Sequence, residues 1–167
     1  MYPKVLFGLF FLMLTACGTL KTSSDVFIDS TVAEDYYRSA VLIESPVFYQ
    51  AQGVGVHLIS LRAKINSEAD IAYQLHIQDS QAVGWRFFDR AYDINGEKFE
   101  FVDIDHDVTL GVTSEIFAIN LSRKYLDKAV TESINIKVFG EDAEKLILVP
   151  SHYVEGFLQK VDDYLSK

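Results

Sequence analysis

The stretch Ile71-Ala72-Tyr73-Gln74-Leu75-His76-Ile77-Gln78 decides the fold, because apolar and polar residues alternate along it without interruption. Successive side chains of a β-strand point to opposite faces of the sheet, so this pattern predicts a strand with one buried face and one exposed face. Residues 54–65, which precede it, also alternate, and Gly55 there is typical of a β-bulge. The centre of the chain is therefore predicted to be β-sheet.

The same period-two pattern continues in both directions along the chain. Residues 85–92 and 98–105 flank Asn95-Gly96, a dipeptide that predicts a hairpin turn in which both residues adopt positive φ. Further strands are predicted at residues 37–44, 114–121, 134–139 and 145–149, the last two as a second hairpin. About seven strands at regular spacing favour an antiparallel β-sandwich, with an α+β fold as the alternative.

Helical spacing is confined to the margins of the domain. Apolar residues recur at helical intervals after Ser151, the expected N-cap, and predict a C-terminal helix that packs on the sheet: Val154, Phe157, Leu158, Val161 and Leu165. Gly156 is expected to cost this helix roughly 1 kcal/mol relative to alanine. Ser122 is expected to cap a short helix that ends near Lys128, and Thr31 with Glu34 matches a capping box that predicts a brief helical start.

The N-terminus has the organisation of a secretory signal peptide. One positive charge, Lys4, precedes the apolar residues 5–14, and small residues follow at Thr15 and Ala16. The uncharged stretch 5–20 is shorter than the roughly 20 residues that span a bilayer, which favours a cleaved signal over a retained anchor. Residues 1–16 are therefore predicted to be removed on export.

The sequence Leu14-Thr15-Ala16-Cys17 resembles the lipobox of bacterial lipoproteins. The resemblance implies cleavage between Ala16 and Cys17, followed by acylation of Cys17, which becomes the point of attachment to the membrane. Gly18 stands where an Asp would resemble the inner-membrane retention signal of Gram-negative lipoproteins. The resemblance thus implies the periplasmic face of the outer membrane. Cys17 is also the only cysteine, so lipidation accounts for a lone thiol in an exported chain.

The remainder divides into a predicted lipidated tether at residues 17–30 and one globular domain at residues 31–167.

The whole chain carries 24 Asp and Glu against 15 Lys and Arg, a formal net charge of −9. Nucleic-acid phosphates require clustered Lys and Arg, so this balance excludes nucleic acid as the expected partner. No cofactor is predicted.

The acidic segment Asp103-Ile104-Asp105-His106-Asp107 is the strongest candidate for a chemical site. On a regular strand its three aspartates would project from one face about 7 Å apart, where a hard cation such as Ca²⁺ would relieve their repulsion. An EF-hand loop is excluded, because Val108 and Ser114 occupy the positions of the required Gly and Glu. The alternative interpretation is a solvated strand end that leads into a loop.

The other polar residues carry no recognisable motif. The four histidines, His57, His76, His106 and His152, lack metal-binding spacing and are expected to be half-exposed sheet residues. No serine has the sequence context of a catalytic nucleophile. Phe87 and Phe88 would face opposite ways on a strand, so one ring is expected outside the main core, either covered by a helix or exposed as a binding surface.

These observations favour a membrane-anchored envelope lipoprotein that acts as a non-catalytic interaction or assembly module with an envelope protein partner. The alternative is an envelope hydrolase or a divalent-cation-binding protein that uses the carboxylates of Asp103, Asp105 and Asp107. The sequence assigns no catalytic residue and no metal ligand with a recognised spacing, which leaves the enzymatic question open and favours the first interpretation. Cys17 is the one residue to which it assigns a chemical role.

Overall fold

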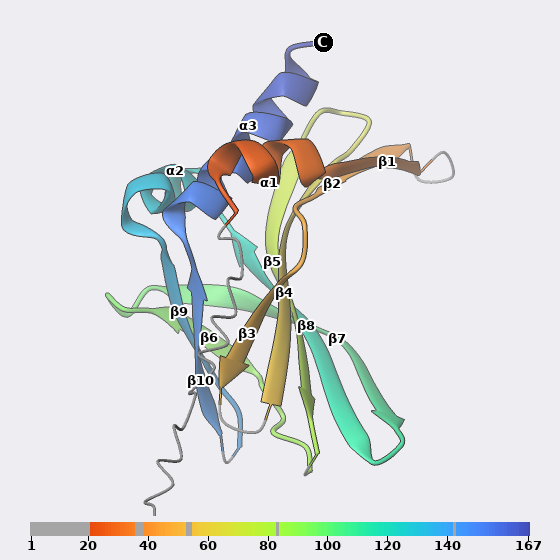
Figure 1. Cartoon of the computed structure of the whole chain (residues 1–167), viewed down its shortest axis with the longest axis vertical. Helices are drawn as coiled ribbons and strands as arrows, with labels where there is room; N and C mark the ends of the chain where they lie inside the picture. Colours follow the sequence, from red (N-terminus) through yellow and green to blue (C-terminus); the bar gives the residue numbers. More distant parts are fainter. Residues whose placement is uncertain (1–20, 36–38, 53–54, 83, 142) are drawn as a thin grey trace, which may run out of the picture.

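The computed structural model describes residues 21–35, 39–52, 55–82, 84–141 and 143–167. The signal peptide, the lipobox and Cys17 lie outside the described residues. Within them the chain is mainly antiparallel β with a C-terminal helix, as predicted (Figure 1). The strands are β1 (Thr31–Asp35), β2 (Ala40–Glu44), β3 (Phe48–Gln52), β4 (Gly55–Ile65), β5 (Ile71–Gln81), β6 (Arg90–Asp93), β7 (Lys98–Thr109), β8 (Val112–Leu121), β9 (Ile134–Phe139) and β10 (Glu144–Val149). The helices are α1 (Ser23–Asp29), α2 (Arg123–Glu132) and α3 (Ser151–Leu165).

The ten described strands form one antiparallel sheet that curls over the core, which agrees broadly with the predicted antiparallel β-sandwich of about seven strands. Its order is β1-β2-β4-β5-β8-β7-β6-β9-β10, and β3 pairs with β4 beside this path. The curl brings β10 next to β3, where the Gln50 side chain joins them. Gln50 Nε2 donates to the carbonyl of Leu146 at 3.1 Å, and the amide of Leu148 donates to Gln50 Oε1 at 3.2 Å. One side-chain amide thus supplies the hydrogen bonds that a strand pair would make.

The alternation that predicts β5 also defines the core. Tyr73, Leu75 and Ile77 point to the inner face of the curl, and the last two are fully buried. Ile59 and Leu61 of β4 lie in the same phase because the register pairs Ile59 with Ile77 and Leu61 with Leu75. Burial of these side chains is the main stabilising contribution to the fold.

The C-terminal helix packs as the sequence predicts. Val154, Phe157, Leu158 and Val161 are buried, whereas Leu165 is partly exposed at the end. Its N-cap is Pro150, so the expectation of Ser151 as the cap is wrong; Pro150 has extended backbone angles and Ser151 is already the first helical residue. Ser122 does cap α2, since its Oγ accepts from the Tyr125 amide at 3.1 Å.

Gly156 of α3 is required by the close approach of α1. A Cβ atom at this position would lie 2.2 Å from the carbonyl oxygen of Ser23 and 2.7 Å from Cβ of Val26. Val26 is fully buried against α3, and Thr22 caps α1 through a capping box with Asp25. The predicted tether at residues 17–30 is therefore wrong for residues 23–29. These residues form α1, which belongs to the domain because it packs against α3 at Gly156.

The expected helical start at residues 31–34 is also wrong. Thr31–Asp35 forms β1, which pairs with β2 from Thr31 opposite Glu44 to Asp35 opposite Ala40. The hairpin at Asn95-Gly96 is confirmed, but its turn differs from the predicted one. Only Gly96 has positive φ, at 83°, and its amide donates to the Asp93 carbonyl at 3.1 Å. Asn95 needs no left-handed backbone in this longer turn.

Candidate functional site

The acidic segment lies in β7, where a bulge divides its aspartates. Asp103 pairs with Phe117 of β8, and Asp105 pairs with the adjacent Ile116. Adjacent residues of β8 point to opposite faces, so the extra residue, Ile104, moves the later aspartates to the other face of the sheet. The predicted common face is therefore wrong: Asp105 and Asp107 share one face, and Asp103 lies on the opposite face.

The expectation that this segment is a strand end leading into a loop is wrong as well. β7 continues to Thr109 and forms a hairpin with β8 that projects from the sheet (Figure 1). In the part of the chain that the structure describes, no group of three or more His, Cys, Asp or Glu side chains is placed to hold a metal ion. Asp103 instead lies with Oδ1 3.5 Å from Nδ1 of His106.

We call residues 100–113 the acidic hairpin, and most of its surface is exposed, although Trp85 packs on one face with its ring 5.3 Å from that of His106. Every residue from Asp103 to Val112 is solvent-exposed, and Leu110 at the tip is 99% exposed. The sequence has no Lys or Arg between Lys98 and Arg123, whereas exposed carboxylates occur at Glu100, Asp103, Asp105 and Asp107. The acidic hairpin thus combines uncompensated negative charge with exposed apolar side chains.

The residue at the tip of the acidic hairpin, Leu110, is poorly suited to the left-handed backbone conformation that it adopts there. Leu110 and Gly111 have φ of 51° and 80°, so both central residues of this turn are left-handed. Asn or Gly is favoured at such positions, whereas an ordinary residue with a Cβ costs about 1–2 kcal/mol. A leucine here is therefore unfavourable both for its backbone and for its contact with water. Strain of this kind motivates a functional hypothesis.

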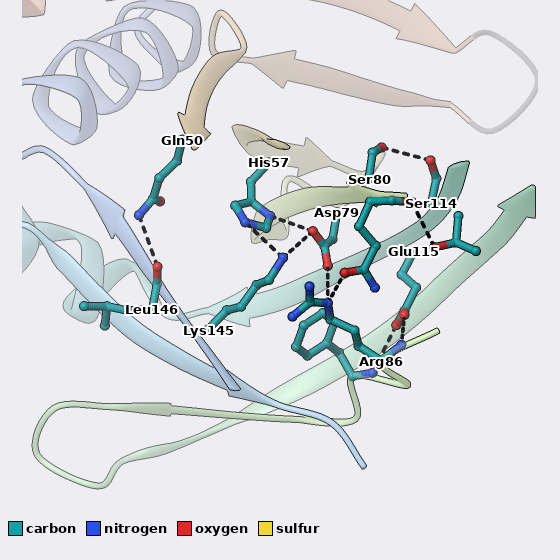
Figure 2. Close-up of polar contacts among 12 residues, drawn as sticks. Gln50, His57, Asp79, Ser80, Arg86, Ser114, Glu115, Lys145 and Leu146 are labelled. Carbon is teal, nitrogen blue, oxygen red and sulfur yellow. Dashed lines mark hydrogen bonds and ion pairs between the residues drawn. The ribbon is translucent and has the colours of Figure 1, made fainter. Parts of the chain in front are cut away.

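A second polar group, which we call the interior cluster, lies inside the curl and consists of His57, Asp79, Lys145, Arg86 and Glu115 (Figure 2). Three of these residues lie side by side on neighbouring strands because of the sheet register. His57 of β4 pairs with Asp79 of β5, and Asp79 pairs with Glu115 of β8. Lys145 reaches the row from β10 because the curl closes there. The sequence interpretation did not identify this group.

Lys145 and Asp79 form a buried ion pair beside an imidazole. Lys145 Nζ donates to Asp79 Oδ1 at 2.6 Å and lies 3.1 Å from His57 Nε2. Because an ammonium can only donate, Nε2 accepts, which places the proton of a neutral imidazole on Nδ1. His57 Nδ1 lies 2.9 Å from Asp79 Oδ1, so both contacts of the ring are electrostatically favourable.

For both Asp79 and Lys145, burial and the neighbouring charges shift the pKa in opposite directions. Desolvation of Asp79 opposes ionisation, but the close contact with His57 Nδ1 and the hydrogen bond from Lys145 outweigh it and hold the pKa of Asp79 below its usual value. Desolvation lowers the pKa of Lys145 and exceeds the opposing attraction of Asp79. The carboxylate and the ammonium compensate each other inside the protein.

Glu115 fixes the loop that lies against the interior cluster. Its carboxylate accepts from the backbone amides of Arg86, Phe87 and Phe88, the last two at 3.2 and 3.1 Å. Phe87 has a φ of 51°, which turns the three amides toward the carboxylate. Phe88 is buried and Phe87 is 48% exposed, so one of these rings lies outside the core as predicted, but the predicted strand is wrong for residues 85–89, which form a loop before β6.

The interior cluster is closed to substrates in this conformation. The side chains of His57, Asp79 and Lys145 are 0%, 1% and 5% exposed, and a general acid or base must contact its substrate. The expectation of a half-exposed His57 is therefore wrong. A signal was present in the sequence: His57 has the same phase as Ile59, and Asp79 has the same phase as Ile77. We interpret the interior cluster as structural.

Comparisons of the chain with protein-family models, with curated proteins and with solved structures find no match. Among the described residues, no helix has both the length and the apolar character needed to cross a membrane.

Proposed function

We propose that this protein is a lipid-anchored bacterial envelope lipoprotein that acts as a non-catalytic interaction module, with the acidic hairpin as its binding part. The observation that carries the proposal is Leu110, which is 99% exposed at a left-handed position of the turn. Neither folding nor solubility favours leucine there, whereas contact with a partner would bury it. The polar groups inside the sheet are closed to substrates, and Lys145 neutralises Asp79, so they do not carry the proposal, although His57 Nδ1 and Asp79 Oδ2 have no hydrogen-bond partner among the described residues.

The proposed anchor gives the hairpin an orientation. The chain from Cys17 to the start of α1 at Ser23 spans at most about 20 Å, which would hold α1 close to the membrane. The helices lie at one end of the molecule and the tip of the acidic hairpin lies at the other (Figure 1). The tip would then extend away from the lipid surface, where an envelope protein can reach it. Gly18 favours the periplasmic face of the outer membrane as the location.

The alternative role as a hydrolase or divalent-cation-binding protein has no comparable support. It required Asp103, Asp105 and Asp107 to converge, and the bulge at Ile104 separates the first from the other two. The interior cluster does not replace them, because Lys145 already neutralises Asp79.

Two experiments test the proposal. Metabolic labelling with a fatty-acid analogue and mass spectrometry of the N-terminal peptide are expected to show an acylated Cys17, and Cys17→Ala is expected to abolish the label and the detergent-phase partition. An unlabelled wild-type chain would contradict the anchor.

The second experiment places a photo-crosslinking amino acid at position 110 in living cells. Position 94 is the matched control, since Ile94 is an apolar residue that is 83% exposed in the turn between β6 and β7. We expect a discrete crosslinked protein from position 110 and none from position 94. Equal products from both positions would show that the tip has no special role.

A further inference from the structure

We infer that the open edge of β7 in the acidic hairpin binds an extended, lysine-rich or arginine-rich segment of a protein partner as an additional strand. This inference rests on the proposed function and specifies the chemistry of the partner. It combines the strand pairing, the charge and the apolar residues of residues 100–109.

The edge of β7 that faces away from β8 is open in the acidic hairpin. β7 pairs with β8 along its length, but on its other side β6 reaches only Phe99 and Lys98. In the described part of the chain, no other strand pairs with residues 100–109 on that side. An open edge of this kind presents backbone amides and carbonyls at the spacing that an extended peptide needs, which is the basis of β-strand addition.

The open edge of β7 carries negative charge. Asp105 and Asp107 lie on one face and Asp103 on the other, so an added strand would meet carboxylates on both of its faces. No described Lys or Arg forms an ion pair with these three side chains. Opposite charges on neighbouring strands attract, and each well-placed pair strengthens binding by about two- to fivefold.

The negative charge of this edge also excludes a second copy of this chain as the occupant. Edge-to-edge pairing of two acidic hairpins would bring aspartates close to aspartates, and like charges on neighbouring strands repel. The whole chain is acidic, with a net charge of −9, so its other surfaces offer little compensation. The charge therefore selects a basic partner.

The acidic hairpin also exposes apolar side chains. Ile104 and Val108 are 48% and 57% exposed on the strand, and Leu110 follows at the tip. A segment in which lysine alternates with a β-branched residue would match both features, with backbone hydrogen bonds for affinity and side chains for selectivity. Such a segment is the simplest partner that this surface fits.

The test uses the full chain as purified from cells and a synthetic peptide of alternating lysine and valine, as long as β7, in calorimetric titrations. We expect saturable binding that weakens at high ionic strength, and no binding of the matched glutamate–valine peptide. A lysine–valine peptide that is N-methylated at every residue keeps its charge but has no backbone N–H on either edge to donate to β7. We expect it to lose most of the affinity; equal binding would show charge adsorption alone and overturn the inference.

Protein variants locate the site. Asp105→Lys combined with Asp107→Lys is expected to weaken binding by about tenfold or more. The control is Glu68→Lys combined with Asp70→Lys, which makes the same charge change at the same spacing in the exposed turn between β4 and β5, and should change the affinity by less than about threefold by long-range electrostatics. Equal losses in the two variants would overturn the inference.

The outcomes distinguish this inference from the proposed function. Failure of every basic peptide, together with a specific crosslink from position 110, would overturn strand addition and leave the interaction module in place. Absence of a crosslink from position 110 would contradict the proposed function whatever the peptides do.

Discussion

Asp79 lies inside the curled sheet, whereas Asp105 lies on the exposed edge of the acidic hairpin, and their surroundings differ accordingly. Asp79 accepts a hydrogen bond from Lys145 at 2.6 Å, lies beside His57 and is 1% exposed. Asp105 is exposed and faces no Lys or Arg among the described residues. A buried charge must be compensated because desolvation is costly, but water solvates an exposed one. The interior cluster is therefore part of the fold, and the acidic hairpin remains available for a partner.

The two hairpin turns show the same contrast. The turn between β6 and β7 places Gly96 at its left-handed position, which matches sequence to backbone at no steric cost. The turn between β7 and β8 places Leu110 at a left-handed position and exposes it almost completely. One turn is optimised for folding, and the other carries a residue that folding alone does not explain.

The largest expected effect concerns the interior cluster. Lys145→Met would leave Asp79 buried without its counter-charge and is expected to lower the free energy of unfolding by about 3–5 kcal/mol in urea denaturation. The matched control is Lys137→Met on β9, which removes the exposed 2.7 Å pair with Glu144 and should cost at most about 1 kcal/mol. Similar losses of unfolding free energy in the two variants would contradict the proposed difference between the buried pair of Lys145 and the exposed pair of Lys137.

Removing both charges sharpens this prediction. Asp79→Leu combined with Lys145→Met should recover most of the lost stability, because no unpaired buried charge remains. In the wild type, ionised Asp79 contributes to the free energy of unfolding above pH 3.8, the pKa of an unfolded aspartate. This contribution is lost as the pH falls through the lower pKa that Asp79 has in the folded protein. The double variant should lack this component of acid unfolding. A double variant less stable than Lys145→Met would contradict this account.

A smaller effect is expected from His76, on the outer face of β5. Burial and the neighbouring Arg62 lower its pKa to about 4, against the attraction of Glu44. The unfolded chain binds the proton first, so the protein should lose about 1–2 kcal/mol between pH 6.5 and about 4, after allowance for solvent screening. His76→Gln should flatten the stability curve in this range. NMR titration of the imidazole gives the pKa directly, and a value near 6.5 would contradict the prediction.

The smallest expected change is a gain in stability. Leu110→Asn places a residue suited to left-handed backbone at the hairpin tip and should stabilise the fold by about 0.5–1 kcal/mol in thermal unfolding, while reducing partner crosslinking from a neighbouring position. Ile94→Asn is the control, because Ile94 is similarly exposed without positive φ. A destabilised Leu110→Asn variant would show that the leucine serves the fold.

Residue patterns within single strands and helices predicted much of this fold. The alternation at residues 71–78 predicted β5, the helical spacing after Ser151 predicted α3, and Ser122 predicted the start of α2. These elements depend mainly on which face of each segment is apolar, and that information is local in the sequence.

The features that the sequence did not predict depend on contacts between distant segments. Helix α1 exists because Val26 packs against Gly156, and the pattern of either segment alone does not show this. The bulge at Ile104 is set by pairing with β8, so the aspartates look regular in the sequence but divide between two faces. Lys145 joins Asp79 only because the sheet curls. Leu110 was missed because Leu-Gly is not a typical turn dipeptide.

The most direct test of the contrast between the two polar regions is an NMR titration of the isotope-labelled chain with the lysine–valine peptide. We expect chemical-shift changes concentrated at residues 100–113, with amides around His57 and Lys145 unchanged. We also expect slower amide exchange along the bound edge of β7. Shift changes centred on the interior cluster, with the acidic hairpin unaffected, would contradict the assignment of structural and binding roles to these two regions.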